Sequence, residues 1–379
     1  MKEMSQRSLF VTSAIIFLAG GVMLLMYLKM FDEVQLMQHL MIISPLFLEF
    51  GFFLLIVAVL FNMANLKKVF SGIPRRIWIL LGATVVAGTL ITAFVAPREP
   101  KILYDEQIYE SIAQNIAELK SSSDFYNMDA SESFGGLWKR IVGRAAMCNN
   151  GRINFGEYHC YALEYNKQPN GWPYVLSLVF RLAGVKEIAS SITNNLIYAL
   201  SVLTVFLIGF LLFKNARTGL WAALVFALTP QVLIWGNTAA VEPSAVLFCA
   251  LAFLSVLIFA QAKDMKSLFL MCVALAFGIQ FRPESFMIFA PAALFMFFFR
   301  PGDLKRAHFY LGLTLLFMLI IPHIVHLWAV RHFDWGSEGT KFSGGFLLGN
   351  LKVNTLYYFN NIRFPVVFTV LAVLGNVCC

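Results

Sequence analysis

The stretch EPSAVLFCALAFLSVLIFAQ, residues 242–261, places one carboxylate ahead of a long run of apolar side chains. A helix needs about 20 apolar residues to cross the hydrocarbon core of a bilayer. Comparable runs recur along the 379-residue chain, which is 59% hydrophobic and only 13% charged. A β-barrel would show shorter segments of alternating character. The sequence therefore predicts an all-α, polytopic transmembrane helical bundle.

Ten stretches of the chain have the apolar character of membrane segments. They are residues 9–28, 41–62, 77–96, 188–213, 218–235, 242–261, 267–282, 284–300, 308–330 and 364–377. The first stretch continues into polar residues without a small-x-small cleavage site, so we expect a membrane anchor rather than a signal peptide. We divide the chain into residues 1–76, two membrane helices with a cytoplasmic loop, and residues 77–379, a larger transmembrane module that includes external loop 97–187.

Basic residues set the predicted orientation, because cytoplasmic loops of membrane proteins are enriched in lysine and arginine. The basic residues between segments fall on one side of the bundle if the N-terminus is cytoplasmic. They are Lys67, Lys68, Arg75, Arg76, Lys214, Arg217, Lys263, Lys266, Arg300, Lys305 and Arg306. The net charge of +8 is thus explained by basic loops that set the orientation of the chain in the membrane. We therefore expect no nucleic acid as a partner. This topology places residues 97–187 and 331–363 outside.

The first external loop carries three structural predictions. Residues 105–119 have isoleucine and leucine at helical spacing, which predicts an amphipathic helix along the membrane surface. Residues 120–135 are rich in serine, aspartate and asparagine and predict an exposed turn region. Residues 172–183 predict a second interfacial helix, ended by Gly184. If the loop faces an oxidising compartment, a disulfide between Cys148 and Cys160 is plausible.

Charged residues gather at the predicted external ends of the segments. Asp105 and Glu106 follow an apolar run, Glu242 opens another, and Arg282 interrupts an apolar stretch before Pro283 and Glu284. A carboxylate in a partly desolvated interface can act as a general base. Cationic side chains such as Lys167 and Arg282 can stabilise charge that develops on a phosphate leaving group. A general base and such cations together fit a nucleophilic displacement at a sugar carbon from which a phosphate leaves.

Each of these residues also has a purely structural interpretation. Asp105 and Glu106 can start a surface helix, where acidic groups favour the positive end of the dipole. Lys167 can be an interfacial lysine, and Glu242 with Pro243 can be a helix start. The sequence around Arg282 can be a tight hairpin with its charges paired.

Three ionisable residues stand out inside apolar segments: Glu49, His323 and His326. Carboxylates are costly there and often functional, but no partner for Glu49 is evident in the sequence. His323 and His326 favour packing over metal binding, since no third ligand accompanies them.

The order of several motifs resembles the GT-C class of membrane glycosyltransferases, specifically the dolichyl-phosphate-mannose protein mannosyltransferase and aminoarabinose transferase families. The motifs are the Asp105-Glu106 pair after a membrane helix, the Lys-x-Pro stretch at residues 167–169, YVLSLVFRLAG at residues 174–184, and LWAALVFALTP at residues 220–230. The resemblance implies transfer of a sugar from a polyprenyl phosphate on the extracytoplasmic face, with inversion. The implied partners are that donor, a protein, lipid or glycan acceptor, and membrane lipid.

The resemblance also implies roles for particular residues. Asp105 matches the presumed base, and Glu242 matches an acidic position that assists at the acceptor or a metal. With Glu106, the neighbour of Asp105, these are the expected catalytic carboxylates. Lys167 and Arg282 match donor-phosphate positions. A divalent cation, Mg²⁺ or Mn²⁺, is a possible cofactor, with Asp105 and Glu242 as candidate ligands. The chain departs from the family pattern because Gln168 replaces a proline and two helices precede the usual first one.

Two other functions fit the same composition. A transporter or lipid flippase also carries ionisable residues in membrane helices, but it predicts interrupted helices in two related halves. A noncatalytic scaffold subunit of a glycan assembly complex predicts that the candidate residues lie scattered. A glycosyltransferase predicts that Asp105, Lys167, Glu242 and Arg282 gather in one place.

Overall fold

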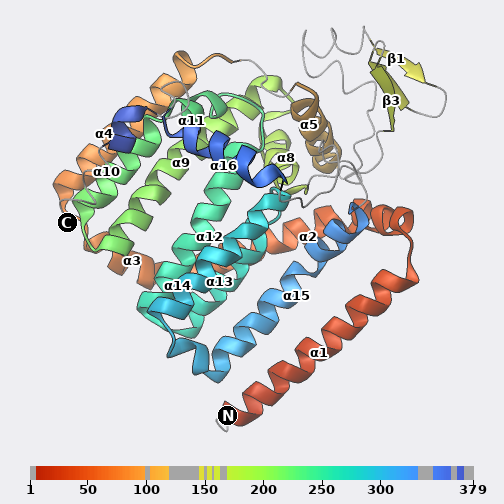
Figure 1. Cartoon of the computed structure of the whole chain (residues 1–379), viewed down its shortest axis with the longest axis horizontal. Coiled ribbons are helices and arrows are strands. Elements are labelled where there is room, and N and C mark those ends of the chain that lie inside the picture. Colours follow the sequence, from red (N-terminus) through yellow and green to blue (C-terminus); the bar gives the residue numbers. More distant parts are fainter. Residues whose placement is uncertain are drawn as a thin grey trace.

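The computed structural model of the chain describes residues 6–98, 103–118, 145–148, 152–155, 158–162, 169–331, 345–359 and 365–370. It is a bundle of long helices with a small sheet beside one end (Figure 1), which confirms the predicted helical membrane architecture. The helices are α1 (Gln6–Met30), α2 (Glu33–Phe61), α3 (Met63–Ser71), α4 (Arg75–Phe94), α5 (Leu103–Ala117), α8 (Gly171–Ala183), α9 (Glu187–Phe213), α10 (Ala216–Ala227), α11 (Pro230–Trp235), α12 (Glu242–Ala262), α13 (Met265–Gly278), α14 (Phe289–Phe299), α15 (Ala307–Ala329) and α16 (Gly345–Tyr357), with 3-10 turns η1 (Pro283–Ile288) and η2 (Asp303–Lys305).

Six helices of the described chain are long and apolar enough to cross a membrane: α1, α2, α4, α9, α12 and α15. Three other predicted segments fall on shorter apolar helices, which are Ala216–Ala227, Met265–Gly278 and Pro283–Phe299. The predicted segment 218–235 divides into α10 and α11 because Pro230 disfavours helical backbone in the residue before it. Most of segment 364–377 lies outside the described residues.

Long helices pack side by side through the bundle (Figure 1). Helix α9 contacts α4, α10 and α12, and α13 contacts α12, α2 and α15. Helices α9 and α10 approach so closely that a Cβ on Gly209 would lie 3.0 Å from the Cα of Gly219. Small residues permit such close packing between membrane helices. Helices α1 and α2 pack against α15. The division of the chain into two modules after residue 76 stays a prediction.

Helix α5 confirms the helix predicted in the first external loop. Its polar residues, however, have different surroundings from those predicted. Its polar residues Glu110 and Gln114 are 1% and 7% exposed, so these two side chains face the protein rather than water. Helix α8 covers α5, and the Ser190 hydroxyl of α9 donates a hydrogen bond of 2.6 Å to Glu110 Oε1. The middle of the helix therefore packs against other parts of the protein and does not present these polar residues to water.

Helix α8 confirms the second predicted helix of this loop. It ends where expected, at Gly184, whose φ of 79° suits glycine and whose N–H bonds to the carbonyl of Phe180. Arg181 near its end forms an ion pair of 3.4 Å with Glu49. A partner that is 132 residues away in sequence explains why none was evident for Glu49.

Strands β1 (Ala145–Cys148), β2 (Arg152–Phe155) and β3 (Tyr158–Ala162) form an antiparallel sheet in the order β1-β2-β3. Cys148 pairs with Arg152 of β2, and Cys160 pairs with Asn154 of β2. The two cysteines are thus two strands apart, about 10 Å by strand spacing alone. A disulfide needs Cα atoms within about 7 Å, so the expected bridge does not fit this register. The predicted turn region 120–135 lies outside the described residues.

Candidate functional site

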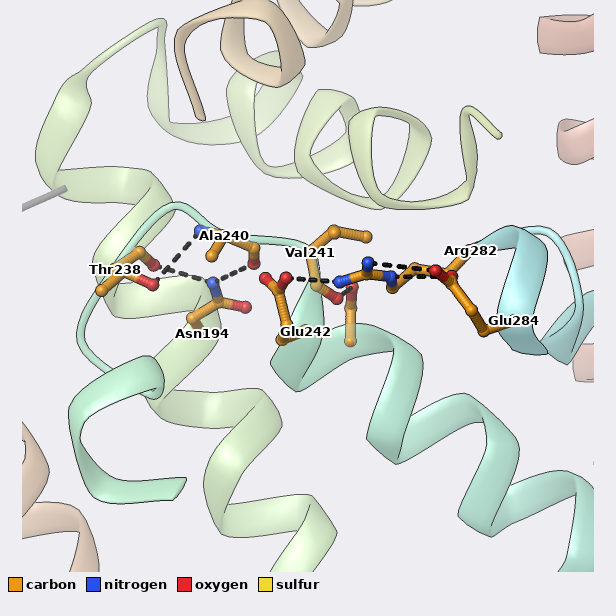
Figure 2. Close-up of polar contacts among 8 residues, drawn as sticks. Asn194, Thr238, Ala240, Val241, Glu242, Arg282 and Glu284 are labelled. Carbon is orange, nitrogen blue, oxygen red and sulfur yellow. Dashed lines mark hydrogen bonds and ion pairs between the residues drawn. The ribbon is translucent and has the colours of Figure 1, made fainter. Parts of the chain in front are cut away.

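Arg282 joins two carboxylates at the start of α12 and the α13–η1 connection. Its Nη1 donates to Glu242 Oε1, and its Nε donates to Glu284 Oε2 at 3.1 Å. Figure 2 shows the guanidinium between the two carboxylates. The side chains of Arg282 and Glu242 are 29% and 26% exposed, so the pair is only partly hydrated. The Arg-Pro-Glu hairpin therefore pairs its own charges and also reaches a second helix.

The electrostatic surroundings favour a fully charged Arg282. Burial works against the cation, but the hydrogen bond to Glu284 and the charges of Glu242 and Glu284 raise the pKa of the guanidinium above its usual value. A planar guanidinium with several donors suits carboxylates and phosphates alike. Arg282 can thus hold an anionic group without losing its own proton.

Tyr109 connects this charge cluster to α5. The residue is 3% exposed, and burial raises the pKa of its phenol, as do the charges of Asp105 and Glu242, while Arg282 lowers it. Charges act on a group in this way only at short range. Asp105 lies one helical turn before Tyr109, so the two share a face of α5. Asp105, Glu242 and Arg282 therefore gather around a protonated phenol.

Glu106 has different surroundings from its neighbour in sequence. It is 1% exposed, and its Oε2 accepts a hydrogen bond of 3.1 Å from the backbone N–H of Ala239. The carbonyl of Ala239 accepts another, of 2.8 Å, from Trp172 Nε1 in α8. Helices α5 and α8 thus hold the loop that leads into Glu242 through the N–H and the carbonyl of a single residue, Ala239.

Asn194 of α9 holds the same loop from below. Its Nδ2 donates to the carbonyls of Thr238 and Ala240, at 2.7 and 2.8 Å (Figure 2). Asn195 donates to the side chain of Asn237 at 3.1 Å. Buried polar groups of this kind fix a loop in one conformation when they are hydrogen-bonded. The position of Glu242 is therefore set by four separate segments of the bundle.

Gly171 brings the start of α8 against the segment before Arg282. Its N–H donates to the carbonyl of Gln280 at 2.8 Å. A Cβ at this position would lie 2.4 Å from the same carbonyl oxygen. Only glycine permits this approach, which links the helix that carries Trp172 to the hairpin that carries Arg282.

Three of the four residues predicted to gather do so, and the fourth is not described. Lys167 and Gln168 lie outside the described residues, which resume at position 169. His323 and His326 lie inside the bundle, 1% and 4% exposed, with stacked rings 6.1 Å apart. This arrangement agrees with packing rather than a metal site.

The carboxylates of the site do not fit the divalent cation considered from the sequence. Glu242 pairs with Arg282, so one of the two candidate metal ligands already binds a cationic side chain. Among the residues that the structure describes, no three His, Cys, Asp or Glu side chains gather as a metal site would require. In this structure Arg282 supplies positive charge beside Glu242.

Sequence reasoning missed Tyr109, Trp172 and Asn194. Asn194 and Asn195 did carry a signal, because two adjacent amides inside an apolar run must find hydrogen-bond partners in the bundle. Tyr109 and Trp172 carried none, since aromatic residues are common throughout this chain.

Comparison with known proteins finds one similar family. Residues 167–326, somewhat under half of the chain, match the family model described as dolichyl-phosphate-mannose-protein mannosyltransferase. The matched range contains Lys167, Glu242 and Arg282 and begins after Asp105. No curated protein and no solved structure matches the chain. Over this range the chain is similar to dolichyl-phosphate-mannose-protein mannosyltransferases, and six of its described helices are long and apolar enough to cross a membrane.

Proposed function

We propose that this protein transfers a sugar from a polyprenyl-phosphate donor to an acceptor hydroxyl on the extracytoplasmic face, with inversion at the sugar. The observation that carries the proposal is the gathering of Asp105, Glu242 and Arg282 around Tyr109. A potential base and a phosphate-binding cation at one end of a membrane bundle are what such a displacement requires. The family match favours a mannosyl donor and a protein acceptor.

Asp105 acts as the general base in this proposal. As the acceptor oxygen forms its bond to the anomeric carbon, the carboxylate takes the hydroxyl proton. The bond between that carbon and the phosphate oxygen breaks, and the polyprenyl phosphate leaves with the bonding electrons. Attack from the face opposite the leaving group inverts the anomeric centre.

Arg282 stabilises the phosphate that leaves. Because it contacts both Glu242 and Glu284, it can exchange one carboxylate for a phosphate oxygen while the other holds its guanidinium in place. Oriented donors of this kind stabilise developing charge without rearrangement at the moment of reaction. Lys167 is proposed as a second cation on the donor phosphate, from its place in the family motif.

The orientation of α12 supports a site on the extracytoplasmic face. This helix starts at Glu242 and ends at Ala262, directly before basic Lys263. Basic connections favour the cytoplasm, so the opposite end of the same helix faces outward. In Figure 1, α5, α8 and α11 lie toward one end of the bundle, and α3 and the α14–α15 connection lie toward the other.

The test is transfer by membranes that contain Asp105→Asn protein. The asparagine keeps the size of the side chain but cannot accept the proton, so transfer should fall by about 100-fold or more. The assay supplies labelled mannosyl polyprenyl phosphate, with other sugar donors in parallel, and follows the label into protein, lipid and glycan fractions. Glu118→Gln, at the exposed end of the same helical segment, is the matched control and should retain activity.

Three outcomes would overturn the proposal. Well-folded Asp105→Asn protein that transfers sugar at the wild-type rate would remove Asp105 as the base. Wild-type protein that moves no label from any donor, yet assembles with other membrane proteins, would favour the scaffold function. Label that crosses the bilayer while still attached to polyprenyl phosphate would favour a flippase.

A further inference from the structure

A second site lies at the opposite end of α12 from Glu242. A cavity of about 590 Å³ opens between α3, the last turns of α9 and α12, and the residues that lead into α13. Helix α12 has 21 residues, so the cavity is about 30 Å from Glu242. It shares no residue with the candidate transfer site.

The lining of this cavity combines charge with apolar surface. Lys68 and Lys214 contribute two ammonium groups, and Asn65 and Gln261 contribute amides. Apolar side chains complete the wall; they are Val69, Phe210, Leu211 and Ile258. A mixed lining of this kind suits a ligand with an anionic head and a hydrocarbon body.

The lysines are available to a ligand. Within the described residues, neither Lys68 nor Lys214 forms an ion pair with a carboxylate. Asp264 also lines the cavity, but its oxygens accept hydrogen bonds from the Ser267 N–H at 2.8 Å and from Asn65 Nδ2 at 3.1 Å. Its carboxylate caps α13, and the net charge of the lining stays positive.

The cavity also lies beside the C-terminal ends of α9 and α12, two helices that are long and apolar enough to cross a membrane. Helix α3 connects the two membrane helices α2 and α4 and carries Lys67 and Lys68 beside apolar Val69 and Phe70. No residue of α3 is buried within the protein. Basic pockets at cytoplasmic membrane surfaces attract anionic lipid head groups, because the inner leaflet is negatively charged.

We propose that this cavity binds the head group of an anionic phospholipid of the cytoplasmic leaflet. Lys68 and Lys214 contact the phosphodiester, the two amides contact the polar head, and Val69 and Phe210 contact the first methylenes of the acyl chains. The apolar half of the lining favours a lipid over free phosphate, which has no hydrocarbon to bury. The proposal does not depend on the activity of the site at the other end of α12.

Native mass spectrometry of the purified full-length chain tests this proposal with dioctanoyl phosphatidylglycerol as the probe. Wild-type protein should bind one equivalent saturably. The double variant Lys68→Gln/Lys214→Gln should bind about 30-fold more weakly, since each lysine near an anionic lipid contributes about fivefold. Lys67→Gln/Lys263→Gln removes the same charge from the same face outside the cavity, and its affinity should match the wild type.

A further variant blocks the cavity without changing its charge. Gly72 lines the cavity with an ordinary helical φ of −77°, and a Cβ there would meet only ordinary contacts, the nearest at 3.5 Å. Gly72→Leu should therefore fold and should weaken binding of phosphatidylglycerol. Unchanged binding by both this variant and the double lysine variant would overturn the proposal.

Parallel probes identify the ligand chemistry. Dioctanoyl phosphatidylcholine, which carries no net charge, should bind much more weakly than phosphatidylglycerol. Inorganic phosphate and glycerol 3-phosphate should not displace the lipid at equal concentration. Equal loss of binding in the two double variants would indicate a general basic surface, and displacement by free phosphate would indicate a soluble ligand; either result would refute a lipid site.

Discussion

Adjacent carboxylates at residues 105 and 106 have separate environments, and we expect separate functions. Asp105 lies with Tyr109 near Glu242 and Arg282, whereas Glu106 is buried and holds the backbone at Ala239. Successive helical residues point about 100° apart, so one side chain faces the site while the next faces its supporting loop. We infer that Glu106 is a positioning residue.

Replacement of Glu106 tests that function. Glu106→Ala removes the acceptor for the Ala239 N–H and should lower kcat by about 10- to 100-fold, since a buried donor left without its charged partner costs about 1.5 to 3 kcal/mol. Glu106→Gln keeps an acceptor oxygen at the same reach and should restore much of the activity. Initial rates over a range of donor concentrations measure both variants.

The comparison between the two variants decides the role of Glu106. Rescue by glutamine is expected of a residue that positions a loop, because the amide oxygen can still accept the hydrogen bond. Glutamine and alanine variants with equally low kcat would contradict this role and would indicate that the charge of Glu106 takes part in transfer.

At the scale of single elements, the sequence predicted the helices better than their surroundings. The length and composition of each apolar run are local properties, and they predicted α1, α2, α4, α9, α12 and α15. The burial of Glu110 depends on Ser190, 80 residues later, and the pairing of Glu242 depends on Arg282, 40 residues later. Contacts at such separations leave no periodic signal in either segment.

The contact between α8 and the Gln280 segment gives a prediction at this scale. In Gly171→Ala the new methyl group would have to displace the Gln280 carbonyl, which a Cβ would approach to 2.4 Å. Overpacking of this kind typically costs about 1 to 3 kcal/mol. We expect a lower Tm in detergent and reduced transfer, because Arg282 lies two residues after Gln280.

Gly82→Ala is the matched control for this substitution. Gly82 lies within α4, and a Cβ there would meet nothing within 4 Å. Alanine favours helix over glycine, so the Tm of this variant should stay level or rise. An unchanged Tm and unchanged activity in Gly171→Ala would show that α8 and the Arg282 hairpin can separate without consequence.

The two ends of the helical bundle carry different charged groups. Carboxylates and Arg282 gather around α5 at one end, and lysines surround a mixed cavity at the other end. The sequence predicted this division, because charges must lie at helix ends when the hydrocarbon core excludes them. It could not predict the cavity, whose walls come from α3, α9 and α12 and form only when these helices pack.

The accessibility of single cysteines in intact cells measures which end of the bundle faces outward. Lys186 and Lys305 are both exposed lysines, one before α9 and the other before α15. In a chain whose six cysteines are replaced, Lys186→Cys should react with a membrane-impermeant maleimide, because the α8–α9 connection faces outward in our topology. Lys305→Cys should react only after the cells are permeabilised. The reverse pattern would place Asp105 and Arg282 in the cytoplasm, and a polyprenyl-phosphate donor would then have to be used on the inner leaflet.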